Sequence, residues 1–116
     1  MNKRYYRKYI EKLIAANPST ITIKRKEKID DGYGGEIIED VEITETIRFY
    51  EKKARREVKS NYGTTYVGVE VTKILALHDA DIREKDTFEH EGKTYRVLFV
   101  ENYFDICKQI ELEVVA

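Results

Sequence analysis

Cysteine, proline and tryptophan are scarce in this sequence of 116 residues, which contains one cysteine, one proline and no tryptophan. The single thiol, Cys107, can form neither an intramolecular disulfide nor a metal site that requires two cysteines. An unpaired thiol indicates a reducing compartment. We therefore interpret Cys107 as a half-buried residue of a strand.

Long apolar runs are absent as well. No segment approaches the ~18 apolar residues of a membrane helix, and the N-terminal residues form no apolar run of signal-peptide length. We expect a soluble protein that is made in the cytoplasm and does not contact a membrane.

An excess of one charge is also lacking, because 21 basic residues are balanced by 22 acidic residues for a formal net charge of −1. A protein that binds duplex DNA mainly through its phosphates usually has a clear basic excess. Hydrophobic residues make up 41% of the chain and charged residues 37%. These proportions predict one domain with a small core and a highly charged surface.

No pattern in the sequence predicts catalysis or a cofactor. The spacing of 78–81 and His90 matches no known metal site, and 30–32 lacks the alternating acidic ligands of a calcium loop. Cys107 has no activating neighbour in the sequence. The glycine-rich segment 32–35 follows a charged stretch and precedes no helix, unlike a phosphate-binding loop, and we interpret it as a hairpin turn. We expect no enzyme, no metal and no cofactor.

One helix is predicted over Lys3–Ala16, and the N-terminal segment 1–17 contains it. Its apolar residues recur with helical spacing, and Asn17 and Pro18 end it. This stripe is rich in tyrosine, so the helix is expected to pack on the following domain or on a neighbouring subunit. The residues of the stripe are Tyr6, Tyr9, Ile10, Leu13 and Ile14.

From Pro18 onward the apolar period becomes two, which is typical of strands. Because no helices separate the strands, parallel pairing is disfavoured. The fold class predicted for 18–116 is mainly β, a small antiparallel SH3/OB-like barrel of five to seven strands. Tyr95, Val97 and Phe99 are expected to fill one face of its longest late strand. The expected strand segments are 19–28, 36–50, 66–77, 86–88, 94–100 and 106–115, with a tight turn at 90–93.

A long polar loop is predicted at about 52–65, where apolar residues almost disappear. Long loops in small domains are often functional. We interpret this one either as a solvated loop or as a contact with an acidic surface or with nucleic acid. Its candidate binding residues are Lys52, Lys53, Arg55, Arg56, Lys59 and Tyr62.

Several short segments carry a family resemblance by their order and spacing. They are Ser19–Arg25, Asp31–Gly35, Ile47–Tyr50, Ala80–Ile82 with Asp86–Phe88, and Gly92–Val97. Together they resemble the head-tail connector proteins of long-tailed bacteriophages, in particular the stopper or head-completion group with its relatives in PBSX-type prophages.

The resemblance implies a virion structural protein that assembles as a homo-oligomeric ring between the portal-adaptor stack and the tail. The free protein can be a monomer, and assembly takes place in the host bacterial cytoplasm. In that family a loop reaches into the central channel and helps to retain packaged DNA. By position, segment 52–66 of this chain is the candidate for that loop, although its run of charges departs from the family pattern.

The residues alone leave one alternative open. Small OB-like barrels bind single-stranded nucleic acid with surface aromatics and basic residues, and Tyr62 and Tyr66 lie beside Arg55, Arg56 and Lys59 in sequence. Interleaved acidic residues argue against this function.

Overall fold

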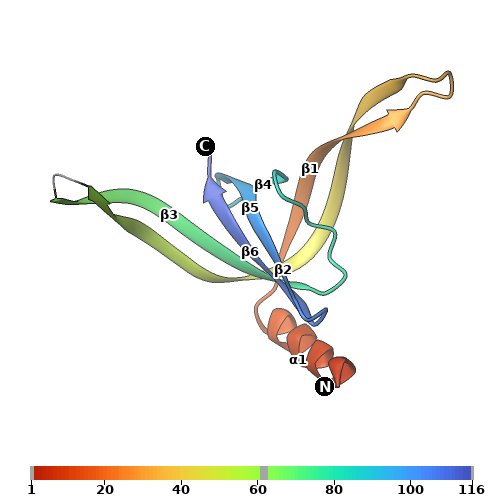
Figure 1. The fold of residues 1–116 in the computed structure, drawn as a ribbon. Coiled ribbons are helices and arrows are strands. Elements are labelled where there is room, and N and C mark those ends of the chain that lie inside the picture. Colours follow the sequence, from red (N-terminus) through yellow and green to blue (C-terminus); the bar gives the residue numbers. More distant parts are fainter. Residues whose placement is uncertain (1, 61–62, 116) are drawn as a thin grey trace.

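A computed structural model describes residues 2–60 and 63–115, with side-chain surroundings for 2–51 and 72–115 (Figure 1). In the described part of the chain, no helix has the length and apolar character needed to span a membrane. The elements in chain order are α1 (Lys3–Ala16), β1 (Ser19–Asp30), β2 (Glu36–Ser60), β3 (Gly63–Leu77), β4 (Thr87–His90), β5 (Lys93–Tyr103) and β6 (Cys107–Val114).

Six antiparallel strands form a closed barrel in the order β1-β2-β3-β6-β5-β4. The predicted fold class is therefore confirmed: the protein is mainly β, with one N-terminal helix over the expected residues. The last three strands follow each other through tight turns. Glu91 and Gly92 both have positive φ between the paired residues His90 and Lys93, as a two-residue hairpin turn of this hand requires.

Strand β2 pairs with two neighbouring strands, β1 and then β3. It has 25 residues, against about 5–6 in an average strand. Its first half pairs with β1 up to Ile47, and from Arg48 onward it pairs with β3. Because both halves run beyond the barrel, two β-ribbons project from it in different directions (Figure 1). The molecule is correspondingly elongated, with principal extents of 58 × 41 × 29 Å.

The loop predicted at about 52–65 is instead part of the β2–β3 ribbon. The ladder continues from Lys52 opposite Thr72 to Ser60 opposite Gly63, with residues 61–62 outside the described part. A ribbon satisfies its backbone groups by pairing alone, so strands form here without the apolar alternation that burial imposes. The polar composition of this segment is therefore compatible with paired strands, and the prediction of a loop was wrong.

The core fills the barrel and follows the predicted alternation in β1 and at Tyr95 and Val97. The prediction that Phe99 fills the same face is wrong, because this residue is 50% exposed. The register shifts between Val97 and Phe99, so that Val97 faces Leu112 but Phe99 faces Glu111. A bulge of this kind reverses the inward and outward sides. The core residues are Ile21, Ile23, Ile47, Ile74, Ala76, Ala80, Ile82, Phe88, Tyr95, Val97, Ile110 and Leu112.

The seam between β1 and β4 is closed mainly by side chains. The two strands share one paired position, Lys24 opposite Thr87. Next to it, the Arg25 guanidinium donates from Nε and Nη2 to the two carboxylate oxygens of Asp86, at 3.0 and 2.7 Å. The two side chains are only 6% and 4% exposed. This buried bidentate pair links β1 to the start of β4, the neighbouring strands that share the fewest backbone pairs.

Asp81 completes the seam cluster. Arg25 Nη1 donates to its carboxylate and Nη2 to its carbonyl oxygen, both at 3.0 Å. The hydrogen bond from Arg25 holds the pKa of Asp81 below its usual value. Burial opposes the charge of Arg25, but its carboxylate partners outweigh burial and raise the guanidinium pKa further. Arg25 and the two aspartates come from segments that carry the family resemblance, which the fold brings together.

Candidate assembly surfaces

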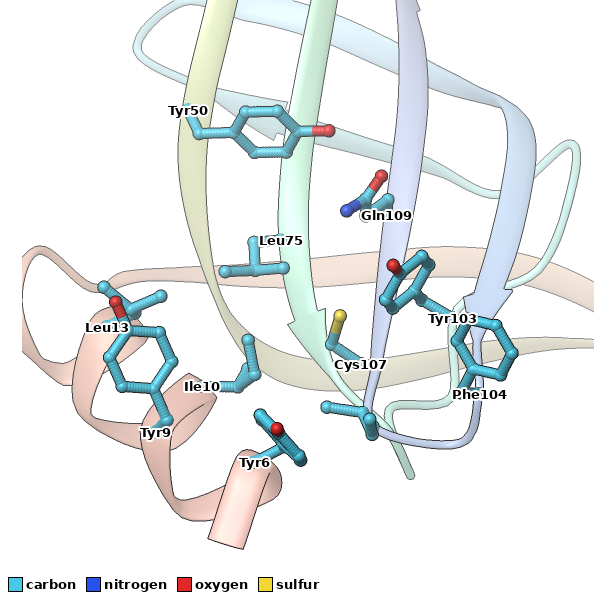
Figure 2. Close-up of a pocket in the computed structure, with 11 residues that line it drawn as sticks. Tyr6, Tyr9, Ile10, Leu13, Tyr50, Leu75, Tyr103, Phe104, Cys107 and Gln109 are labelled. Carbon is cyan, nitrogen blue, oxygen red and sulfur yellow. The ribbon is translucent and has the colours of Figure 1, made fainter. Parts of the chain in front are cut away.

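An apolar groove lies between α1 and the turn that joins β5 to β6 (Figure 2). Its volume is about 530 Å³. Tyrosines of the helix form one side and aromatic residues of the turn form the other, with strand residues behind them. The main lining residues are Tyr6, Tyr9, Leu13, Leu75, Tyr103 and Phe104.

The helix wall of the groove is held at both ends by polar contacts. At its C-terminal end Ile14 is buried, and Arg48 Nη1 donates to the carbonyl oxygen of Leu13 at 2.8 Å. Nearer its start, Arg7 Nε donates to the carbonyl oxygen of Asp105 at 2.8 Å. The helix therefore has a defined place, while Tyr6 and Tyr9 remain largely exposed.

The opposite wall is a turn with an unusual backbone. Phe104 and Asp105 both have positive φ, at 52° and 57°, and an aromatic residue rarely adopts that conformation. Asn102 stabilises the turn by accepting from the Asp105 backbone N–H at 3.0 Å and donating to its carboxylate at 2.9 Å. The Phe104 ring is 61% exposed. Strain that presents an apolar ring to solvent points to a binding role.

Charge and burial also shape this groove. The hydrogen bond from Asn102 and the charge of Lys3 hold the pKa of Asp105 below its usual value, so the carboxylate is ionised when it contacts the helix. Cys107 lies on the groove wall, and burial raises the pKa of its thiol. A protonated, buried thiol is a poor nucleophile.

A second surface is the tip of the β1–β2 hairpin, at the end of the other ribbon. Asp31 Oδ1 accepts from the backbone N–H groups of Tyr33 and Gly35 at 2.7 and 3.0 Å. Gly32 and Gly34 both have positive φ, which glycine adopts without strain. This arrangement projects Tyr33 into solvent with 94% exposure. The glycine-rich segment is thus a hairpin turn, as the sequence indicated.

The five basic residues of the predicted binding site are on β2 within the β2–β3 ribbon, and the sixth residue, Tyr62, lies outside the described residues. A register shift between Ala54 and Arg56 divides the basic run. The side chains of 52–71 also lie outside the described part, so partner binding by this ribbon stays a prediction. The five placed residues are Lys52, Lys53, Arg55, Arg56 and Lys59.

The sequence analysis missed the groove, although a signal for it was present. Tyr103 and Phe104 are adjacent aromatics inside a turn, where polar residues are usual. Their rings pack edge to face with centroids 4.8 Å apart. An aromatic pair in a turn, together with a tyrosine-rich helix, is a reason to look for a shared surface.

Comparison with known structures finds a protein of similar fold. In fold, this chain is similar to a phage-element protein. The match is to xkdH of the phage-like element PBSX of Bacillus subtilis, with a TM-score of 0.52 and 14% sequence identity. It covers 84% of this chain and 93% of that chain. No protein-family model matches the chain, and no curated protein matches it. The likeness establishes a shared fold.

Proposed function

We propose that this protein is a structural component of a phage head-tail connector, which assembles as a ring between the portal-adaptor proteins and the tail. The observation that carries the proposal is the fold shared with a PBSX phage-element protein over most of both chains. The proposed role is assembly and binding rather than catalysis. Assembly would take place in the bacterial cytoplasm, and the mature location would be the virion neck.

The architecture fits a ring subunit. A small barrel leaves little surface for specific contacts, but two ribbons and an apolar groove extend the reach of this one. Because a closed ring requires head-to-tail contacts between unlike surfaces of neighbouring copies, projecting and recessed surfaces on one chain support the proposal.

The β2–β3 ribbon is the segment that we propose for the central channel. Its basic run, Lys52 to Lys59, could contact DNA locally, while the overall charge of −1 gives the rest of the wall no strong attraction for phosphates. Such a ribbon would help to retain packaged DNA.

The decisive experiment mixes the purified protein with portal-side proteins from the same genome and images the product. The proposal predicts rings that contain this protein. Replacing Lys52, Lys53, Arg55, Arg56 and Lys59 by glutamine should leave the rings intact and increase DNA loss from assembled heads. Absence of any ring or partner complex would refute the connector role. Micromolar binding of single strands that weakens with salt and with Arg56→Gln would instead favour a nucleic-acid-binding module.

A further inference from the structure

We propose that the tip of the β1–β2 hairpin of one copy docks in the groove between α1 and the β5–β6 turn of a second copy. We define the tip as residues 29–41. The inference rests on the proposed ring assembly and adds the surfaces through which neighbouring copies would meet.

The two surfaces match in apolar character. The tip presents Tyr33 at its end, and Ile38 is 66% exposed on its second strand. Ile37 lies opposite Ile29, whereas Ile38 lies opposite Lys28. Since alternate residues of a strand point to opposite faces, the tip carries an apolar residue on each face. A ribbon of this kind is suited to insertion between two walls, and the groove supplies walls from α1 and the β5–β6 turn.

The charges of the two surfaces are opposite. The tip contains five carboxylates and neither lysine nor arginine, whereas α1 contains five basic residues and one glutamate, and the β5–β6 turn adds one carboxylate, Asp105. Facing potentials of opposite sign guide docking and fix its orientation. The same pattern disfavours pairing of tip with tip or helix with helix. The tip carboxylates are Asp30, Asp31, Glu36, Glu39 and Asp40, and the helix cations are Lys3, Arg4, Arg7, Lys8 and Lys12.

Both surfaces are shaped before they meet. Asp30 accepts from the Gly32 N–H at 2.8 Å, in addition to the two bonds that Asp31 accepts within the tip. Contacts of α1 with Asp105 and Arg48 hold the groove wall in place. Little ordering is therefore needed on binding, and this saves free energy of association.

The placement of the two surfaces requires a second molecule. The tip ends the ribbon that projects away from α1, so it does not lie over the groove of its own chain (Figure 1). A projecting patch that fits a recess elsewhere on the same chain gives a heterologous contact, which builds rings or open chains. Figure 2 shows the groove without any residue of the tip among its lining side chains.

Two complementary variants of the full chain test the contact. The tip variant carries Tyr33→Ser and Ile38→Asp, and the groove variant carries Tyr9→Glu and Phe104→Asn. All four positions are exposed, and asparagine tolerates the positive φ of residue 104 better than most residues do. Leu98→Asp, an exposed apolar position on β5 outside both surfaces, is the matched control.

Sedimentation velocity at protein concentrations up to about 1 mM measures the association. Wild type and Leu98→Asp should associate with rising concentration, and each double variant should weaken the association at least tenfold. An equimolar mixture of the two double variants should form a one-to-one dimer and nothing larger, because each supplies the surface that the other lacks. The inference is overturned if all variants behave like wild type, if wild type stays monomeric throughout, or if the mixture forms no dimer.

Imaging with portal-side proteins separates this inference from the connector role. If both double variants still form rings, the connector role stands and the tip–groove contact does not. If the mixture dimerises but wild type forms no ring with any portal-side protein, the contact stands and the connector role does not.

Discussion

Replacing Arg25 by leucine should destabilise the protein far more than replacing the exposed Arg83 of the same cluster. The substitution leaves the Asp86 carboxylate, which is 4% exposed, without its cation. Breaking a buried ion pair from one side costs about 3–5 kcal/mol. Since a domain is stable by only about 5–15 kcal/mol, we expect Arg25→Leu to remove a large part of the stability.

The assay is denaturant unfolding followed by far-ultraviolet circular dichroism, with thermal unfolding as a second measurement. A loss of this size should lower Tm by more than about 10 °C. Arg83→Leu is the matched control. Its side chain also contacts Asp81, at 3.2 Å, but is 61% exposed, and an exposed pair contributes about 0–1 kcal/mol.

A double-variant cycle shows whether the pair or the individual side chains carry the effect. Asp86 Oδ2 also accepts from the Arg83 backbone N–H at 2.7 Å, so Asp86→Leu leaves that donor unpaired. Arg25→Leu combined with Asp86→Leu should therefore recover only part of the loss, yet be more stable than the sum of the single effects predicts. Equal losses for Arg25→Leu and Arg83→Leu, or strict additivity in the cycle, would refute the reasoning.

Three further predictions concern pH, the bulge and a turn. Because Arg25 lowers the folded pKa of Asp81, this pair stabilises the fold fully above the unfolded pKa of about 3.9. The stabilisation is lost as pH falls through the folded pKa. Unfolding measured across acid pH should therefore show a smaller loss of stability in Arg25→Leu than in wild type. Phe88→Ala should cost about 3–5 kcal/mol in denaturant unfolding, whereas Phe99→Ala should cost under about 1 kcal/mol, and similar losses would contradict the bulge. Gly92→Ala, at a φ of 80°, should cost roughly 1–2 kcal/mol in the same assay, and no loss would show that the hairpin turn relaxes.

Sequence reasoning succeeded where burial imposes a period. The residues of α1 followed from a helical stripe that ends before Pro18, and Ile21 and Ile23 followed from an alternation that places them in the core with 1% and 0% exposure. The tight turn before β5 followed from a glycine at the position that requires positive φ. In each case one local rule and the demand for a buried face indicate the same structure.

The candidate surfaces were harder to predict because no single periodicity encodes them. The groove combines α1 with a turn that lies about 90 residues later in the chain, and only the closed barrel brings them together. The exposure of Phe99 was not predicted for a related reason. One extra residue in the ladder exchanges the inward and outward faces of the strand, and the alternation of residue types does not reveal it. Errors of this kind arise wherever tertiary pairing, rather than local pattern, decides which way a side chain points.

The two ribbons show why polarity alone misleads. Residues 29–41 and the paired segments 52–60 and 63–65 continue the ladders of β1, β2 and β3 as ribbons. The first was nevertheless predicted as a hairpin, because Gly32 and Gly34 mark the turn. The second also carries a turn signal at 60–63, but the scarcity of apolar residues over 52–65 led to its interpretation as a loop. A strand that leaves its barrel keeps its ladder but no longer requires a binary pattern. If the ring proposal is correct, those unpatterned extensions are where neighbouring subunits and DNA make contact, and the residues least informative about the fold are the most informative about assembly.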